Sequence, residues 1–150
     1  MWRHPALRPL SREHFTALSL IRDVRWAAVS GAAVLRDRAA LELASAWRDS
    51  LAGHFDDEEA VLLPHMNEEE SAELLSQHKQ LRDLVAPLLA DLAAGRAPQV
   101  AHAEPVAEAL EAHVRWEEQT LFQGMQARLG DAQWQQVEAS LAKARGEPIG

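Results

Sequence analysis

The chain of 150 residues contains no cysteine, which excludes disulfide bonds, iron–sulfur clusters and zinc sites built from thiolates. Aromatic residues are few apart from five tryptophans, and β-branched residues are scarce beside alanine and leucine. This composition favours helices over sheets. A chain of this length is expected to form one domain, residues 1–150, around one sizeable hydrophobic core.

The chain also lacks an excess of basic residues and any long hydrophobic run. Its formal net charge is −8, which argues against non-specific binding to nucleic acid, since that requires a basic surface. No stretch reaches the roughly 18 apolar residues that can span a bilayer. The first residues, MWRHPALRPLSREHF, lack the continuous apolar segment of a signal peptide. We therefore expect a soluble, cytoplasmic protein that has neither a nucleic-acid nor a membrane partner.

The most informative feature that is present is a stretch that occurs twice. Residues 54–66 read HFDDEEAVLLPHM and residues 113–125 read HVRWEEQTLFQGM. At a constant offset the identical pairs are His54/His113, Glu58/Glu117, Glu59/Glu118, Leu62/Leu121 and Met66/Met125. A His and a Glu four residues apart on a helix differ by about 40° around the axis and about 6 Å along it, so both side chains can reach one point. The two pairs in matched apolar frames indicate two halves of a metal site.

The apolar period and the turn residues predict an all-α, up-down-up-down four-helix bundle with its core at residues 11–130. Residues 1–10 are expected to form an ordered or frayed arm before a first helix that Ser11 caps. The second helix is expected to regain its period near Ala39, and Asn67 to cap the third. The fourth begins between Pro98 and Pro105. A short additional helix at about residues 131–145, capped by Asp131, is expected to pack on the bundle.

Four histidines fall at one height in this bundle. Residues at equal height in antiparallel helices lie at equal sequence distance from the turn between them. The midpoint of His54 and His78 falls on Met66, and that of His78 and His113 falls beside Gly95, where turn residues occur independently. The midpoint of His14 and His54 falls in a helix-compatible segment and gives a weaker indication. One histidine per helix at one height is typical of a site inside a bundle core.

A single histidine on an apolar face is more often a hydrogen-bonded core residue than a metal ligand. The joint set differs, because four imidazoles and two carboxylates buried without a cation leave charge uncompensated. Glu59 and Glu118 lie about 140° from their histidines around a regular helix, so we expect surface positions or indirect contacts through another ligand. Three further histidines lie near turns or prolines and are expected to be exposed: His4, His65 and His102.

At these positions residues 11–126 resemble the hemerythrin-like family, also called HHE cation-binding domains. The resemblance implies a four-helix bundle that holds a non-haem di-iron centre with carboxylate bridges. The metal ligands that it implies are His14, His54, Glu58, His78, His113 and Glu117. Oxygen-carrying members are expected to place a further histidine one turn before the third-helix ligand, where this chain has Leu74, and commonly have Asp in place of Glu117. Reversible oxygen transport is therefore not expected.

Six protein ligands exceed what one tetrahedral zinc ion accepts and suit two metal ions. Imidazole and carboxylate suit iron, manganese or zinc, and the resemblance favours two iron ions. The sequence thus predicts a protein that binds or senses O2, NO or another small oxidant, or takes part in iron handling. The alternatives are a di-iron enzyme of peroxidase, NO reductase or oxidase type, and a metal-free helical interaction module. The chain has no tyrosine, which excludes a tyrosyl-radical role.

Overall fold

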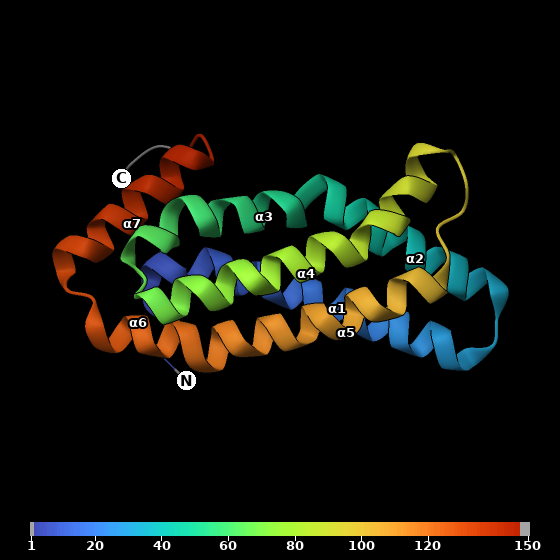
Figure 1. Cartoon of the computed structure of the whole chain (residues 1–150), viewed down its shortest axis with the longest axis horizontal. Helices are drawn as coiled ribbons and strands as arrows, with labels where there is room; N and C mark the ends of the chain where they lie inside the picture. Colours follow the sequence, from blue (N-terminus) through green and yellow to red (C-terminus); the bar gives the residue numbers. More distant parts are fainter. Residues whose placement is uncertain (1, 148–150) are drawn as a thin grey trace.

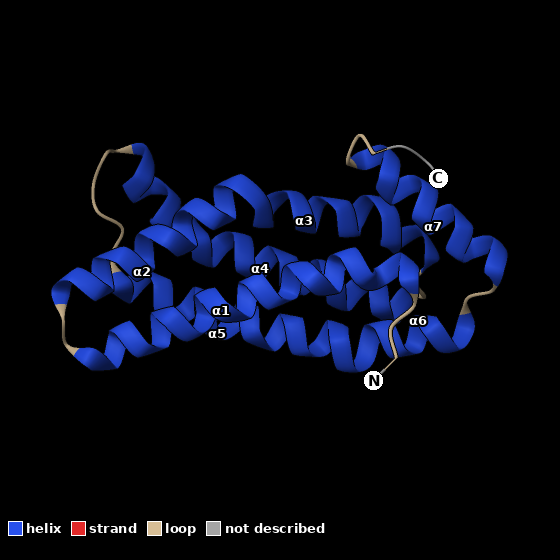
Figure 2. Cartoon of the chain, turned by 180° about the vertical axis from the view of Figure 1, so that it is seen from behind, coloured by secondary structure: helices blue, strands red, loops and turns tan. Residues whose placement is uncertain are grey.

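A computed structural model describes residues 2–147, and every regular element among them is helical. Four long helices run antiparallel along the long axis of the molecule, and a shorter helix lies across one end (Figure 1). Figure 2 shows the same arrangement from behind, with loops confined to the two ends of the bundle. The predicted four-helix bundle with an additional C-terminal helix is confirmed. No helix among the described residues has the length and apolar character needed to cross a bilayer.

The first long helix is α1 and the third is α4, whereas the second and fourth are composite. A 3-10 turn precedes α1, and π-helical turns interrupt the composite helices. In chain order the elements are η1 (Pro5–Leu7), α1 (Arg8–Ser30), α2 (Ala33–Ala46), η2 (Trp47–Leu51), α3 (Ala52–Asp57), η3 (Glu58–Leu62), η4 (Leu63–His65), α4 (Glu68–Ala93), α5 (Val100–Trp116), η5 (Glu117–Leu121), α6 (Phe122–Arg128) and α7 (Asp131–Ala144).

The predicted starts of three helices are wrong. The first helix begins at Arg8, because Pro9 suits a first helical turn, and Ser11 therefore lies inside α1 and caps nothing. The second helix begins at Ala33, since the segment after the turn is itself helix-compatible. The final helix has Gly130 at its N-cap, and Asp131 is its first residue.

The turn chemistry otherwise follows the sequence. Gly31 ends α1 with φ of 75° and Gly95 follows α4 with φ of 72°, a left-handed backbone that glycine adopts without steric cost. Asn67 caps α4 through a reciprocal pair of hydrogen bonds with Glu70, in which each side chain accepts from the other residue's backbone N–H. These turns fix where the buried face of each helix begins.

Two apolar clusters lie on either side of a polar layer. The larger cluster fills the half of the bundle that contains the α1–α2 turn, with Ile21, Val24, Leu43, Leu81, Val85, Val106 and Leu110. The smaller cluster fills the other half and includes Leu10, Leu62, Leu74, Leu121, Phe122 and Met125. In α4, Leu74 belongs to the smaller cluster and Leu81 to the larger one, with buried His78 between them in sequence. A hydrophobic core therefore encloses the polar layer at both ends.

The N-terminal segment and α7 close the end with the smaller cluster. Trp134, Val137 and Leu141 of α7 are buried in that cluster, which confirms that this helix packs on the bundle. The ring of His4 stacks on Trp134 with 4.2 Å between centroids and 15° between planes. Residues from opposite ends of the chain thus form one cover over the bundle.

We predict that Asn67→Ala lowers the free energy of unfolding by about 1 kcal/mol, because it removes the capping box at the start of α4. Urea denaturation measures this loss. The matched control is Gln99→Ala at the N-cap of α5, where no side chain caps the helix, so stability should stay nearly constant. Equal effects of the two substitutions would contradict the assigned role of Asn67.

Candidate metal centre

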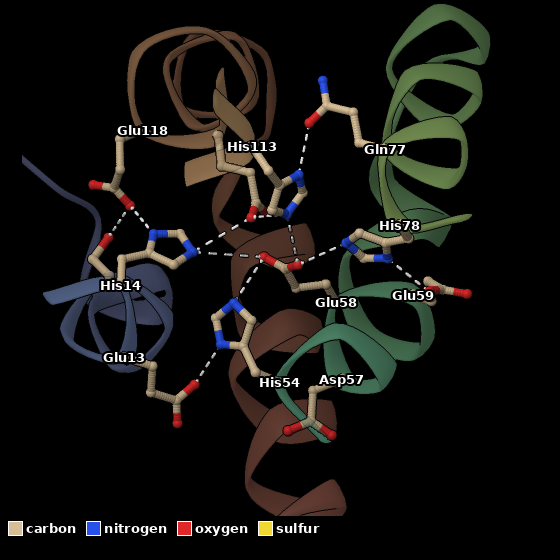
Figure 3. Close-up of polar contacts among 12 residues, drawn as sticks. Glu13, His14, His54, Asp57, Glu58, Glu59, Gln77, His78, His113 and Glu118 are labelled. Carbon is tan, nitrogen blue, oxygen red and sulfur yellow. Dashed lines mark hydrogen bonds and ion pairs between the residues drawn. The ribbon is translucent and has the colours of Figure 1, made fainter. Parts of the chain in front are cut away.

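Six polar side chains meet in the layer between the two apolar clusters. Each is at most 4% exposed, and together they come from all four long helices: His14, His54, Glu58, His78, His113 and Glu117. Glu58 lies at the centre, with the imidazoles around it (Figure 3). The structure therefore brings together every residue of the predicted ligand set.

The six side chains form two overlapping groups of potential ligands. In the first, ligand atoms of His14, His54, Glu58 and Glu117 lie within 4.8 Å of one another. His54 Nε2 is 3.3 Å from Glu58 Oε2, and His14 Nε2 is 3.4 Å from Glu117 Oε1. This group offers two imidazoles and two carboxylates.

The second group consists of Glu58, His78 and His113. Here the facing atom is the other oxygen of Glu58, because His78 Nε2 lies 3.1 Å and His113 Nε2 lies 3.6 Å from Oε1. Glu117 Oε1 is also 2.6 Å from His113 Nε2. Glu58 therefore presents one oxygen to each group, and Glu117 Oε1 lies near a histidine of each. This is a suitable geometry for carboxylates shared between two cations.

Both central glutamates occupy the first residue of a π-helical turn. The N–H of Leu63 donates to the carbonyl of Glu58, and the N–H of Phe122 donates to the carbonyl of Glu117. Such wide turns inside α-helices are rare and frequent at functional sites. The repeated sequence thus produces a repeated backbone irregularity at the same place in the site.

Each histidine is held from outside the layer by a side chain on a neighbouring helix (Figure 3). The Nδ1 atoms lie 2.8 Å from Glu118 for His14, 2.7 Å from Glu13 for His54, 2.7 Å from Glu59 for His78 and 2.6 Å from Gln77 for His113. The first helix supports the second, the second the third, the third the fourth, and the fourth the first. The four contacts therefore close a ring around the bundle.

This ring fixes the orientation of the imidazoles. Carboxylate oxygens only accept hydrogen bonds, so Nδ1 is the donor at three of the contacts. At the fourth, Gln77 Nε2 donates to Glu73 at 2.7 Å, which leaves Oε1 to accept from His113. Every Nε2 atom consequently faces the centre. Outer acceptors of this kind are typical of histidines that bind metals.

Arginines neutralise the three outer carboxylates. Arg145 lies 2.7 Å from Glu13, Arg82 lies 2.6 Å from Glu59, and Arg3 lies 3.2 Å from Glu118. Arg145 follows α7 and Arg3 belongs to the N-terminal segment. Both chain ends are thereby linked to the layer by short paths of polar contacts.

Several atoms that point into the layer have no hydrogen-bond partner among the described residues. They are Nε2 of His14, His54 and His113, Oε2 of Glu58 and both carboxylate oxygens of Glu117. A buried polar atom without a partner costs about 1–3 kcal/mol. Phe55 walls the site, with its ring centroid 4.7 Å from that of His78 and 5.2 Å from that of His113. The unpaired donor set is of the kind that cations bind.

The proton affinities show how strongly the layer attracts positive charge. Burial alone would lower the pKa of His54, but attraction from Glu58 and the hydrogen bond to Glu13 raise the pKa to about 10. Burial also opposes protonation of His14 and His113. Contacts with Glu117 and Glu118 nevertheless raise the pKa of His14 to about 9, and Glu117 raises the pKa of His113 to about 10. Burial opposes ionisation of Glu58, yet the positive charge of His54 holds the pKa of this carboxyl well below its ordinary value. Without metal, protons on the histidines balance the carboxylates.

The sequence did not predict the roles of Glu13 and Gln77. Each directly precedes a site histidine, His14 or His78, and each holds the histidine of the next helix instead. The only sequence signal for these two roles is that each residue stands directly before a candidate metal-ligating histidine. Glu59 and Glu118 were expected at the surface or in indirect contact with the site. The structure shows that they accept hydrogen bonds from the central histidines His78 and His14.

The expectation that three other histidines are exposed is wrong. His4, His65 and His102 are all partly buried. His4 Nδ1 accepts from the N–H of Ala6 and caps η1, and His102 lies 3.3 Å from the buried carboxylate of Asp91. The rings of His4 and His102 make polar contacts near helix ends, and none of the three histidines enters the central layer.

Fold and site together define a helical bundle with a buried layer of cation ligands. The family model of the hemerythrin HHE cation binding domain matches residues 6–124, and the chain belongs to this family. No curated protein and no solved structure matches the chain. The resemblance inferred from the sequence is confirmed over most of the chain.

We predict that the stability of metal-free protein, but not that of metal-loaded protein, falls as the pH rises above neutrality. In the metal-free form, the raised histidine pKa values stabilise the fold fully below about pH 6.5, and this contribution is lost as the pH rises towards 10. The lowered pKa of Glu58 makes the opposite contribution, which is lost in acid. Stability of chelator-treated protein should therefore fall between about pH 7 and 9.5.

Metal-loaded protein provides the comparison, because bound cations replace the protons on the histidines. Its stability should rise up to about pH 6.5 and then level off. Urea denaturation of both forms across this range measures the difference. A decline of the same size in both forms would show that the buried histidines do not govern the response.

Proposed function

We propose that this protein is a non-haem di-iron protein that binds or senses a small oxidant such as O2 or NO. In this proposal His14 and His54 would hold one iron ion, and His78 and His113 would hold the other. Glu58 and Glu117 would serve both ions. Bound iron would supply reversible electron transfer and affinity for a diatomic ligand.

The observation that carries the proposal is the position of Glu58 between four imidazoles whose Nε2 atoms point towards it. Its oxygens face different histidine pairs, and unpaired nitrogen and oxygen atoms fill the layer between them. In a metal-free interaction module, only protons on the histidines would offset the cost of burying these carboxylates. Manganese and zinc also accept imidazole and carboxylate, so the preference for iron comes from the family resemblance.

Burial of the layer favours a small ligand over a large substrate. Glu58, His78 and Glu117 are 0% exposed, and apolar side chains enclose the layer at both ends. A diatomic molecule is small enough to approach such a centre, whereas a bulky substrate would have to displace core side chains. The enzyme alternative with peroxide or NO as substrate shares the same centre, and steady-state turnover assays with these two molecules distinguish it.

We predict about two metal ions per chain, with unequal losses in single variants. His14→Ala and His78→Ala each damage one histidine pair and should leave about one metal ion per chain. Glu58→Ala removes the carboxylate that serves both groups and should leave well under one. Elemental analysis of iron-loaded protein measures these values.

Glu108→Ala is the matched control, because this glutamate is exposed on α5 and outside the layer. It should retain the full metal content. Retention of both ions by Glu58→Ala would contradict the assignment of Glu58 as the shared ligand. Loss of both ions from His14→Ala would contradict the division of the histidines into two pairs. Thermal stability should also fall on chelation, since a ligand that binds only the folded state stabilises it.

Leu74 gives the two histidine pairs different surroundings. It lies one turn before His78 on the buried face of α4 and is fully buried in the smaller apolar cluster. The group that contains His78 has fewer clustered ligands than the group that contains His14. Leu74 therefore occupies the position where a further ligand would be expected on the side of His78 and His113, which has fewer potential ligands.

We predict that Leu74→His increases metal retention and costs about 1–3 kcal/mol in metal-free stability, because it places an imidazole in an apolar cluster. Metal loss during timed chelation measures retention. Leu75→His is the control, since Leu75 is 42% exposed and outside both clusters.

In wild type, repeated changes between air and argon without reductant should not restore the spectrum of the reduced protein. Full recovery over many cycles would instead favour oxygen transport or storage.

A further inference from the structure

A pocket of about 410 Å³ opens on the outer face of α1, beside the central layer but not part of it. Its lining consists of three arginines, two further polar side chains, the exposed Phe15 and the carboxylate residue Glu118: Arg3, Arg8, Ser11, Arg12, Phe15, Glu118 and Gln119. The volume lies within the range of small-molecule sites. The pocket thus combines positive charge with an apolar wall.

The charge in this pocket is only partly compensated. Arg3 is committed to Glu118, to whose side chain and backbone carbonyl it donates at 3.2 and 2.9 Å. Arg8 donates its Nε to the backbone carbonyl of Arg3, and neither Arg8 nor Arg12 makes an ion pair within the described part of the chain. Both also lie in the first two turns of α1, where the helix dipole is already positive. Two guanidinium groups therefore remain available to an anion.

The wall of the pocket offers an apolar surface as well as positive charge. Phe15 is 72% exposed and lines the pocket with its phenyl ring. A guanidinium fork binds phosphate or carboxylate oxygens through paired hydrogen bonds, and an aromatic ring favours a planar apolar body. On a chain with a net charge of −8, this local excess of arginine is distinctive.

We propose that this pocket binds a small organic anion, with a phosphate or carboxylate held by Arg8 and Arg12 and a planar apolar body against Phe15. The Ser11 hydroxyl and Arg3 both donate to Glu118, whose Oε2 also accepts from His14 Nδ1. An anion that attracts Arg3 strengthens the hydrogen bond from His14 to Glu118. The pocket is therefore coupled to the metal centre, and this coupling, unlike the binding itself, depends on the proposed function.

Isothermal titration of the 150-residue chain with phenyl phosphate tests the binding, with inorganic phosphate, benzoate and benzyl alcohol as comparison ligands. Phenyl phosphate should bind more tightly than inorganic phosphate and much more tightly than neutral benzyl alcohol. Comparison with benzoate distinguishes a phosphate from a carboxylate preference. Arg12→Ala should weaken phenyl phosphate binding about tenfold, the loss expected for one charge-assisted hydrogen bond.

Arg22→Ala is the matched control, because it removes the same charge from an exposed site on α1 outside the pocket. It should leave binding unchanged. Phe15→Ala should abolish the advantage of phenyl phosphate over inorganic phosphate without weakening inorganic phosphate itself. Equal weakening by Arg12→Ala and Arg22→Ala, or equal binding of benzyl alcohol, would overturn the proposal. Binding of phenyl phosphate to protein without iron tests the pocket alone. If the pocket is coupled to the metal centre, saturation with phenyl phosphate should change the spectrum of iron-loaded protein; an unchanged spectrum would contradict the coupling.

Discussion

The rest of the structure depends on a carboxylate that is buried between four imidazoles. Glu58 is fully inaccessible, and Glu117 beside it is equally buried. Such groups are tolerated in a core only when positive charge lies close to both oxygens. Protonated histidines supply that charge without metal, and cations supply it in the proposed centre. The need to hold that charge in place accounts for the outer ring, the arginines behind it and the apolar clusters on either side.

The outer ring also makes the polar layer part of the architecture. Each histidine is oriented by a residue on a different helix, so a helix that shifted would misplace its neighbour's histidine as well as its own. The ends of the chain join this arrangement through Arg3 and Arg145. The N-terminal segment and α7, which contribute none of the six central residues, thereby help to position them.

The central residues were predictable because they follow helical geometry. A His and a Glu four apart must share a face, and the distances to the turns place four histidines at one height. The outer ring was harder to predict, since Glu13 and Gln77 contact histidines on other helices and no period within one helix encodes that pairing. The π turns were also missed, because an extra backbone residue leaves no distinct side-chain pattern. The early start of α1 at Arg8 reflects Pro9, which a first helical turn accepts, so Ser11 lies inside the helix although its residue type is typical of an N-cap.

The repeated sequence suggests a symmetric centre, but the helices that do not contain the repeat break the symmetry. His54, His78 and His14 donate to carboxylates, whereas His113 donates to the neutral amide of Gln77. A carboxylate acceptor increases the electron density of an imidazole more than an amide does, so His113 is the weaker donor of the four. The same helix, α4, places Leu74 one turn before His78. Both changes affect the pair formed by His78 and His113, and they leave that side of the layer poorer in electron-donating groups. The layer therefore has two inequivalent sides even though its glutamates come from matching sequences, and residues of α4 make the difference.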